Sequence, residues 1–141
     1  MARIKIHLPE KFWFSTQLKL RITDINYGGH LANDAVLGIA QEARLRFLNS
    51  FGYSEKDIEG KSLIMTDAAI MYKSQGYYGD PIEIKIAIDE LSTLGFELLY
   101  LITNTETNKE IARVKTGLAF FDYQSNKLVP VPEPFKAKIQ S

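Results

Sequence analysis

The chain has 141 residues, of which 45% are hydrophobic and 24% charged, an ordinary balance for one folded domain with a substantial core. Its 17 basic and 17 acidic residues give a net charge of zero, which argues against a nucleic-acid-binding protein, because such proteins usually carry a basic excess. The absence of cysteine excludes disulfides, thiolate metal sites and cysteine nucleophiles, and is compatible with the cytoplasmic location that we expect. Charged residues interrupt the N-terminal run, so no cleavable signal fits, and no stretch approaches the roughly 18 apolar residues of a membrane span.

The N-terminal part of the chain predicts two short strands. Residues 3–8 alternate loosely between polar and apolar side chains, and Pro9 ends this first segment. Residues 17–22 alternate more clearly, which is typical of a half-buried strand. The second strand leads the chain into the loop at residues 24–33.

Residues 34–51 are expected to form one long helix. Asn33 is a suitable N-cap residue, and Gly52 is suited to the left-handed position that follows a helix. Arg44 lies within the apolar stripe, so it is expected either to extend to solvent or to pair with a buried carboxylate, with a phosphate contact less favoured. The stripe itself consists of residues spaced by three or four positions: Val36, Ala40, Ala43, Phe47 and Phe51.

The remainder of the chain reads as strands. A short helical turn is expected at residues 54–57, ended by Gly60, and the tail from Pro130 cannot continue a strand. A single long helix followed by antiparallel strands is best buried by a sheet that wraps around it, so an α+β fold is predicted. The expected strands span residues 64–72, which are apolar enough for a central strand, then 82–88, 96–103 and 112–121, with a turn at 104–108 between the last two.

The loop at residues 24–33 is the strongest candidate for a functional site. Gly28 and Gly29 allow a sharp turn and a close approach of the backbone to a ligand. The helix that follows presents unpaired amide N–H groups and the positive end of its dipole, which suit a phosphate, a carboxylate or an oxyanion. Asp24, Asn26 and His30 lie within a few residues of this helix end, an arrangement that favours acyl-transfer chemistry.

The same loop resembles the active-site loop of hotdog-fold acyl-CoA thioesterases, the group that includes 4-hydroxybenzoyl-CoA thioesterase. That loop typically reads Asp-x-Asp-x-x-Gly-His-Val-Asn-Asn, with Glu-Ala-Arg about ten residues later; Asp24, Gly29, His30, Asn33 and residues 42–44 match it. The resemblance implies one domain over residues 1–141, with a curved antiparallel sheet around a central helix and no metal or cofactor. It also implies a homodimer or homotetramer with its sites between subunits.

Residues 72–80 carry a second match, to the family pattern Tyr-x-x-Pro-x-x-x-Gly-Asp. From the two motifs we expect the substrate to be bound by Gly29, Asn33, Asp34, Tyr72, Lys73 and Ser74. Lys73 is the preferred candidate for a CoA phosphate, because it follows an apolar strand and precedes a Gly- and Tyr-rich turn.

The chain departs from the family at Asn26, where the family has the aspartate that acts as general base or nucleophile. An amide cannot take a proton usefully at neutral pH. Asn26 and His30 are therefore expected to orient the thioester carbonyl and the water, while Asp24 or Asp67 takes the proton. Asp24 equally fits a structural role capping its turn, and we favour that role.

Three functions remain open from the sequence. The leading hypothesis is an acyl-CoA or acyl-ACP thioesterase. The second is a hotdog module that lacks catalysis, because of Asn26, and binds an acyl thioester or a partner protein. The third is a dehydratase of hydroxyacyl thioesters, which needs a histidine and an acid where the sequence offers only His30 with an uncertain carboxylate.

Overall fold

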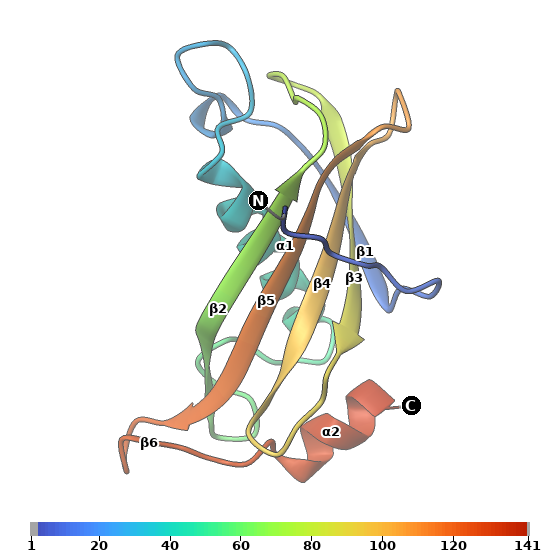
Figure 1. Ribbon diagram of the computed structural model, residues 1–141. Helices are drawn as coiled ribbons and strands as arrows, with labels where there is room; N and C mark the ends of the chain where they lie inside the picture. The colour runs from blue at the N-terminus through green and yellow to red at the C-terminus, as the bar shows by residue number, and fades with distance from the viewer. Residues whose placement is uncertain (1–2, 141) are drawn as a thin grey trace.

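The strands form one curved antiparallel sheet, and the long helix lies along its concave face (Figure 1). The computed structural model describes residues 3–140; residues 1, 2 and 141 lie outside the description, among them the first two residues of the N-terminal run considered above. The order along the sheet is β1-β3-β4-β5-β2, with β6 paired to β5. The predicted α+β class is confirmed. The strands are β1 (Phe14–Lys19), β2 (Ser62–Tyr72), β3 (Pro81–Asp89), β4 (Gly95–Asn104), β5 (Glu110–Asp122) and β6 (Lys127–Leu128).

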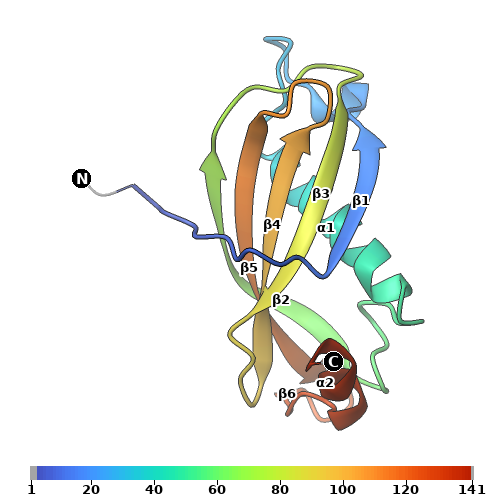
Figure 2. The ribbon, with the colours of Figure 1, turned by 90° about the vertical axis from the view of Figure 1, so that its right-hand side faces the viewer.

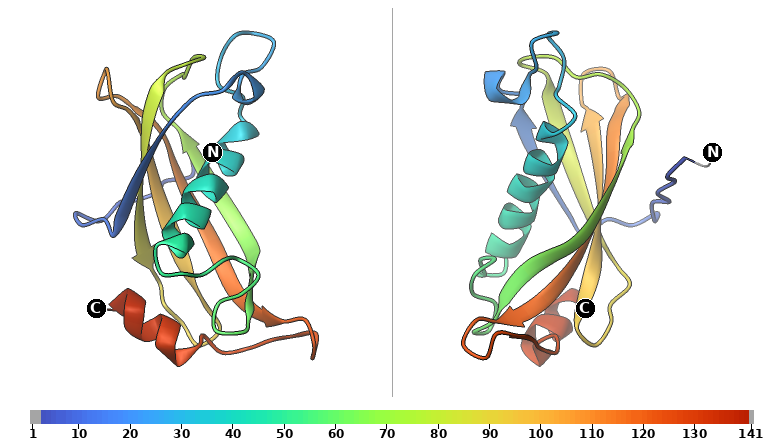
Figure 3. Two further views of the ribbon diagram at one scale, coloured as in Figure 1. Left: turned by 180° about the vertical axis from the view of Figure 1, so that it is seen from behind. Right: turned by 60° about the vertical axis from the view of Figure 1, so that its left-hand side comes forward.

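Helix α1 (Ala35–Asn49) forms because its apolar residues fall on one face, which is buried against the sheet (Figure 3). Burial of each large apolar side chain contributes about 1.5–3 kcal/mol, so this face accounts for much of the stability of the core. The helix ends slightly before the predicted limit, and Gly52 has the left-handed φ of 82° expected after a helix. The buried face consists of Val36, Ile39, Ala40, Ala43, Phe47 and Leu48, together with Arg44.

The prediction that Asn33 caps this helix is wrong. The N-cap position belongs to Asp34, and the Asp34 side chain makes no capping hydrogen bond. The backbone there is already helical, with φ −75° and ψ −18°, whereas a side-chain cap usually needs an extended residue. Instead, the Ala35 N–H donates to the carbonyl of Ala32, and this turn leads the chain into the helix.

Strand β2 lies at the edge of the sheet, whereas its apolar sequence predicted a central strand. It pairs with β5 on one side and with no other strand of residues 3–140 on the other. Met65 is 48% exposed at this edge, and a β-bulge separates it from Asp67. Apolar content was a poor guide here, because it does not report which edges of a strand are paired, and Leu63 is the one buried residue among the 11 of this strand. A long edge of this kind is a template for pairing with another chain.

The N-terminal segment, residues 3–13, forms a strap across the outer face of the sheet, and the predicted strand at residues 3–8 is wrong. Figures 1 and 2 show this segment running across the strands on the side opposite α1. Ile6 is buried there with Ala87 and Leu99. Its backbone bonds to side chains and not to a strand: the Ile6 N–H donates to Met71 Sδ, and Arg113 donates to the Ile6 carbonyl.

The C-terminal residues form a helix that the sequence did not reveal. Helix α2 (Glu133–Gln140) follows the prolines that correctly predicted the end of strand structure. It inserts Phe135, which is fully buried, into an aromatic cluster with Tyr53, Phe96 and Phe120. This cluster closes the end of the core near the C-terminus of α1.

The short helical turn expected at residues 54–57 is absent. Ser54 and Asp57 exchange backbone hydrogen bonds instead, and an isolated bridge joins Ile58 to Lys61. Gly60 has a φ of 85°, which allows the chain to reverse at this bridge. The segment therefore leads directly from α1 into β2 as a tight loop.

Candidate active site

A cavity of about 380 Å³ lies where the N-terminus of α1 meets the end of β2. The fold brings together two groups of predicted residues here, although they are about forty positions apart in the sequence. One group comes from the loop at residues 24–33 and the other from the last residue of β2 and the segment after it. The lining consists of Asn26, His30, Leu31, Asn33, Val36, Tyr72, Lys73, Ser74, Gln75 and Ile111.

The Asn26 side chain organises the loop through its carbonyl oxygen. Oδ1 accepts hydrogen bonds from the backbone N–H of Gly28 at 2.9 Å and of His30 at 3.3 Å. The backbone of Asn26 also bonds to that of His30, and Gly29 has a φ of 86° that closes the turn. Because Oδ1 holds the loop, the Nδ2 group of this exposed side chain is available to donate to a bound carbonyl.

His30 contributes a half-buried imidazole at the cavity wall. Its ring lies edge-on to Tyr77, with the ring centroids 5.3 Å apart. Neither ring nitrogen has a hydrogen-bond partner among residues 3–140, while the backbone of His30 is fixed by Asn26. The ring is thus positioned by packing, and both nitrogens remain free to exchange a proton with a water or a substrate.

The end of β2 is bound to the loop by Tyr72. Its hydroxyl donates to the carbonyl of Asn33 at 3.0 Å, which ties the last turn before α1 to the sheet. Beyond the strand, the Lys73 backbone N–H donates to Ile111, and the exposed Lys73 side chain lines the cavity. Lys73 supplies the one permanent positive charge among the lining residues.

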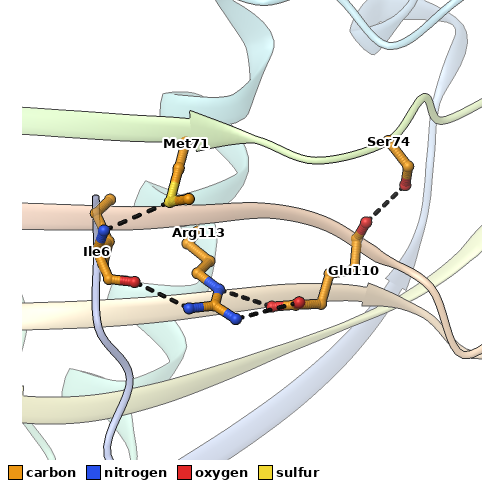
Figure 4. Close-up of polar contacts among 5 residues, drawn as sticks. All are labelled: Ile6, Met71, Ser74, Glu110 and Arg113. Atoms are coloured by element: carbon orange, nitrogen blue, oxygen red, sulfur yellow. Dashed lines mark hydrogen bonds and ion pairs between the residues drawn. The ribbon is translucent and has the colours of Figure 1, made fainter. Parts of the chain in front are cut away.

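Ser74 connects the cavity to the outer face of the sheet. Its hydroxyl donates to the Glu110 carbonyl at 2.6 Å, and the Glu110 carboxylate pairs with Arg113, which also holds the carbonyl of Ile6 (Figure 4). The hydrogen bond from Arg113 lowers the pKa of Glu110 below its ordinary value. The Ser74 hydroxyl therefore points toward the backbone at the start of β5. The strap helps to hold this part of β5 through the Arg113 contact with Ile6.

Gly76 allows the two groups of residues to approach closely. The Leu31 N–H donates to the Gly76 carbonyl at 2.7 Å. A Cβ at Gly76 would lie 2.7 Å from Leu20 Cδ1 and 3.3 Å from Leu31 Cβ, closer than ordinary packing permits. Gly76, which stands at a variable position of the second sequence motif, therefore packs closely against the loop.

The sequence model of the thioesterase-like superfamily matches residues 20–139. The chain belongs to the thioesterase-like superfamily. Thioester hydrolysis is the activity that this membership supports, and the cavity described above falls within the matched residues.

Solved thioesterase structures share the fold. The 1,4-dihydroxy-2-naphthoyl-CoA thioesterase from Synechocystis superposes with a TM-score of 0.83 at 22% identity, covering 91% of this chain and 96% of its own. The DHNA-CoA thioesterase from Staphylococcus aureus gives a TM-score of 0.77 at 21% identity, covering 89% and 87%. A relative from Aquifex aeolicus with a provisional esterase designation is 28% identical over 95 residues, 66% of this chain and 71% of the relative. The predicted hotdog fold is confirmed.

Asp24, one of the two carboxylates expected to take a proton, does not line the cavity of this thioesterase-family chain. It is buried in the 3-10 turn (Ile22–Asp24) that follows β1, where its carboxylate accepts from the Arg21 backbone N–H at 2.8 Å. The Arg21 guanidinium adds two further contacts. These bonds occupy both carboxylate oxygens, and the Asp24 carbonyl accepts a hydrogen bond from the Ala32 N–H, so Asp24 caps its turn; the structural role that we favour for it stays a prediction.

Asp67 also lies away from the cavity. It is exposed beside the bulge of β2, where Thr66 Oγ1 donates to it at 2.7 Å, and it lies over Gly117, where a Cβ would collide with it. It lines a shallow depression together with Lys115 of β5. Because neighbouring residues of a strand point to opposite faces, Lys115 lies on the outer face, opposite to the buried Thr116. The bulge shifts the strand register, so Asp67 faces the outer side of the sheet and not the N-terminus of α1.

Two other predicted contacts, Gly29 and Asp34, shape the loop and the helix start but are not among the lining residues. The sequence reasoning missed Gln75, Leu31, Val36 and Ile111, which do line the cavity. Gln75 occupies the position at which the family motif has proline, and this departure from the motif could have marked it as a candidate lining residue. No local pattern marks Ile111, because only sheet pairing between β2 and β5 brings it beside Tyr72.

Proposed function

We propose that this chain hydrolyses the thioester of an acyl-CoA or acyl-ACP in the cavity between the loop at residues 24–33 and the end of β2. The observation that supports this most directly is the convergence of Asn26, His30, Tyr72 and Lys73 on one cavity at a helix N-terminus. Lys73 is placed to attract an anionic phosphate, which the neutral net charge of the chain does not do. The cytoplasmic location expected from the sequence stays a prediction.

The proposed reaction begins with a water molecule held beside His30. The imidazole takes one proton from the water, and the oxygen adds to the thioester carbonyl. The Asn26 Nδ2 group and the unpaired amides of the first turn of α1 donate to the oxyanion that develops. The C–S bond then breaks, the acid leaves, and the proton on His30 passes to the departing sulfur to give the free thiol.

His30 is assigned the role of base because, among residues 3–140, no carboxylate lines the cavity. The same observation favours the second candidate, a binding module that holds an acyl thioester without hydrolysing it. The two functions differ in one measurable step, the release of the thiol.

A panel of acyl-CoAs with free-thiol detection tests the proposal. Short, long and aromatic acyl groups belong in the panel, the last because structurally similar proteins are thioesterases for aromatic acyl-CoAs. We expect thiol release that depends on the protein with at least one class. Tight binding of an acyl-CoA without hydrolysis of any acyl-CoA or acyl-ACP would replace the enzyme by the binding module.

We further propose that the protein assembles as a homodimer, alone or as a dimer of dimers, through the unpaired edge of β2. This strand has 11 residues, its edge is unpaired within residues 3–140, and Met65 is exposed on it. Antiparallel pairing of two such edges would bring the start of one β2 beside the end of the other, so that each cavity gains a wall from the second copy.

Sedimentation at micromolar concentration is expected to show no 16.0 kDa monomer as the main species. Ala68→Pro in the middle of β2 should shift the protein toward monomer, because proline cannot donate the backbone hydrogen bond and distorts the edge. Leu128→Pro in the short β6 is the matched control and should leave the assembly unchanged. A wild-type protein that sediments only as a monomer would disprove the dimer.

A further inference from the structure

Strand β5 carries a β-bulge at Ile111, at the point where the strand borders the candidate active site. On the neighbouring β4, Ile102 lies opposite Ala112. The next residue, Thr103, lies opposite Glu110, so Ile111 has no partner on β4. Ile111 and Ala112 are both buried, although neighbouring residues of a regular strand point to opposite faces. The bulge therefore turns Ile111 to the inner side of the sheet, where it lines the cavity.

An ion pair on the outer face of the sheet closes this bulge. Arg113 Nε and Nη2 donate to the two carboxylate oxygens of Glu110, at 2.8 Å and 3.2 Å. Residues three positions apart in a regular strand point to opposite faces, so these two side chains meet because the bulge adds a residue between them. Nη1 of Arg113 donates to the Ile6 carbonyl at 2.9 Å, which ties the ion pair to the strap (Figure 4).

The bulge is also bound to the segment that follows β2. The Ile111 carbonyl accepts hydrogen bonds from the backbone N–H groups of Lys73 and Ser74, at 2.9 Å and 3.2 Å. The Glu110 carbonyl accepts the hydrogen bond from the Ser74 hydroxyl. The backbone of residues 110–111 is therefore fixed to the rim of the cavity on one side and by the ion pair on the other, which sets the position of the Ile111 side chain.

Ile111 forms the sheet side of an apolar floor beneath a polar rim. The floor consists of Leu31, Val36 and Ile111, of which Val36 and Ile111 are 1% and 2% exposed. Val36 lies in the first turn of α1, next to the amides that are proposed to bind the oxyanion, so it flanks the reacting carbonyl. An acyl group that extends from this carbonyl toward the sheet would end against Ile111. The cavity volume of about 380 Å³ is near the lower end of the range for small-molecule sites.

We propose that Ile111 sets the maximum length of the acyl group that the cavity accepts, and that the Glu110–Arg113 ion pair holds Ile111 in that position. This inference rests on the proposed function, which supplies the ligand, an acyl thioester whose apolar end lies on the floor. Up to the floor, each further buried methylene raises affinity about fourfold. Beyond it, a further methylene must displace a packed side chain or stay in water, so affinity stops rising.

Calorimetric titration of the full-length protein with S-alkyl-CoA thioethers, from S-ethyl- to S-dodecyl-CoA, tests this length limit. These ligands have no thioester carbonyl, so binding is measured without turnover. Wild-type affinity is expected to rise about fourfold per methylene and then to stop rising at one chain length. Ile111→Ala enlarges the floor, and a cavity made in this way stays apolar, so the limit should move to a chain about two carbons longer.

Two further variants keep the test independent of folding. Ile111→Val removes a single methyl group and should move the limit by about one carbon. Val114→Ala truncates another buried residue of β5 that does not line the cavity, so it should lower the melting temperature without moving the limit. Three results would overturn the proposal: affinity that rises along the whole series in the wild type, a limit unchanged in both Ile111 variants, or an equal shift in Val114→Ala.

Arg113→Gln tests the ion pair as a positioning device. The neutral amide cannot bind both carboxylate oxygens of Glu110 and the Ile6 carbonyl together, so Ile111 is expected to lose its fixed position. A thioether about two carbons beyond the wild-type limit should then bind several-fold more tightly than the thioether at the limit. Lys115→Gln breaks the outer-face pair with Glu97 on the same strand and should leave this ratio unchanged. An unchanged ratio in Arg113→Gln would reject the role of the ion pair.

Thiol release from acyl-CoAs of the same chain lengths separates this inference from the proposed function. A length limit in kcat/KM that shifts in Ile111→Ala supports both. Thiol release without any length limit retains the hydrolysis and rejects the role of Ile111. The expected limit in thioether binding without thiol release rejects the hydrolysis and retains the role of Ile111. Neither binding nor release across the two series rejects both.

Discussion

His30→Ala is expected to lower thiol release from the preferred acyl-CoA by about 100-fold or more, because the imidazole is the proposed proton acceptor and positions the water. The side chain is held by packing on Tyr77 and not by side-chain hydrogen bonds, so its removal should leave the fold intact. The thermal unfolding midpoints of wild type and variant should therefore coincide, and turnover should be compared at a temperature at which both proteins are folded. Turnover within a few-fold of wild type would place the base elsewhere.

Asn26→Ala is expected to cause a loss of similar size, about 100-fold, because it removes both the Nδ2 donor to the oxyanion and the carbonyl that shapes the loop. Asn26→Asp keeps an oxygen acceptor for the N–H groups of Gly28 and His30. It also supplies the carboxylate that the resembling thioesterases use at this position. We expect Asn26→Asp to keep or raise hydrolysis, because the new carboxylate can act as a base and offset the lost Nδ2 donor. A loss as large as that of alanine would contradict this expectation and show that turnover depends on the Nδ2 donor.

The carboxylates outside the cavity provide the matched controls. Asp67→Asn should leave turnover near the wild-type level, since Asp67 faces the outer side of the sheet. Asp24→Asn should lower the melting temperature, because the Arg21 guanidinium and backbone lose a charged acceptor, and any loss of turnover should follow from that. A large loss of turnover in Asp67→Asn with normal folding would transfer the role of base to Asp67.

Phe135→Ala is expected to destabilise the fold by about 3–5 kcal/mol, the range found when a buried aromatic side chain is deleted. Phe135 is fully buried, with ring centroids 5.3 Å from Phe96 and 5.4 Å from Phe120. Its removal leaves a void that these rigid rings cannot fill. Thermal unfolding followed by circular dichroism should show a midpoint lower by roughly 10 °C.

Lys136→Ala, on the same short helix, is the control for this result. Its side chain is only half-buried and makes no hydrogen bond or ion pair within residues 3–140, so the expected change is within about 0.5 kcal/mol. If Phe135→Ala unfolds at the same temperature as Lys136→Ala, then α2 does not dock on the core in the way described.

Local sequence patterns correctly predicted those elements in which the spacing of apolar residues agrees with the face that is buried. The apolar stripe of α1 and the alternation in β3 correspond to faces that are in fact buried, so the helix and this strand were found within a few residues of their ends. The loop chemistry was also local, since Asn26, His30 and the helix start are neighbours in the chain. The sequence therefore determined the main helix, most strands and one half of the candidate site.

Tertiary contacts decided the rest. Three features depend on surfaces that exist only once the sheet has formed: the strap, the edge position of β2 and the docking of α2. No repeating pattern of apolar residues in the sequence marks any of them. The bulge that turns Asp67 to the outer face and the pairing that brings Ile111 to the cavity have the same origin. A sequence pattern records which faces an element buries, whereas the partner strand and the register set which distant side chains meet.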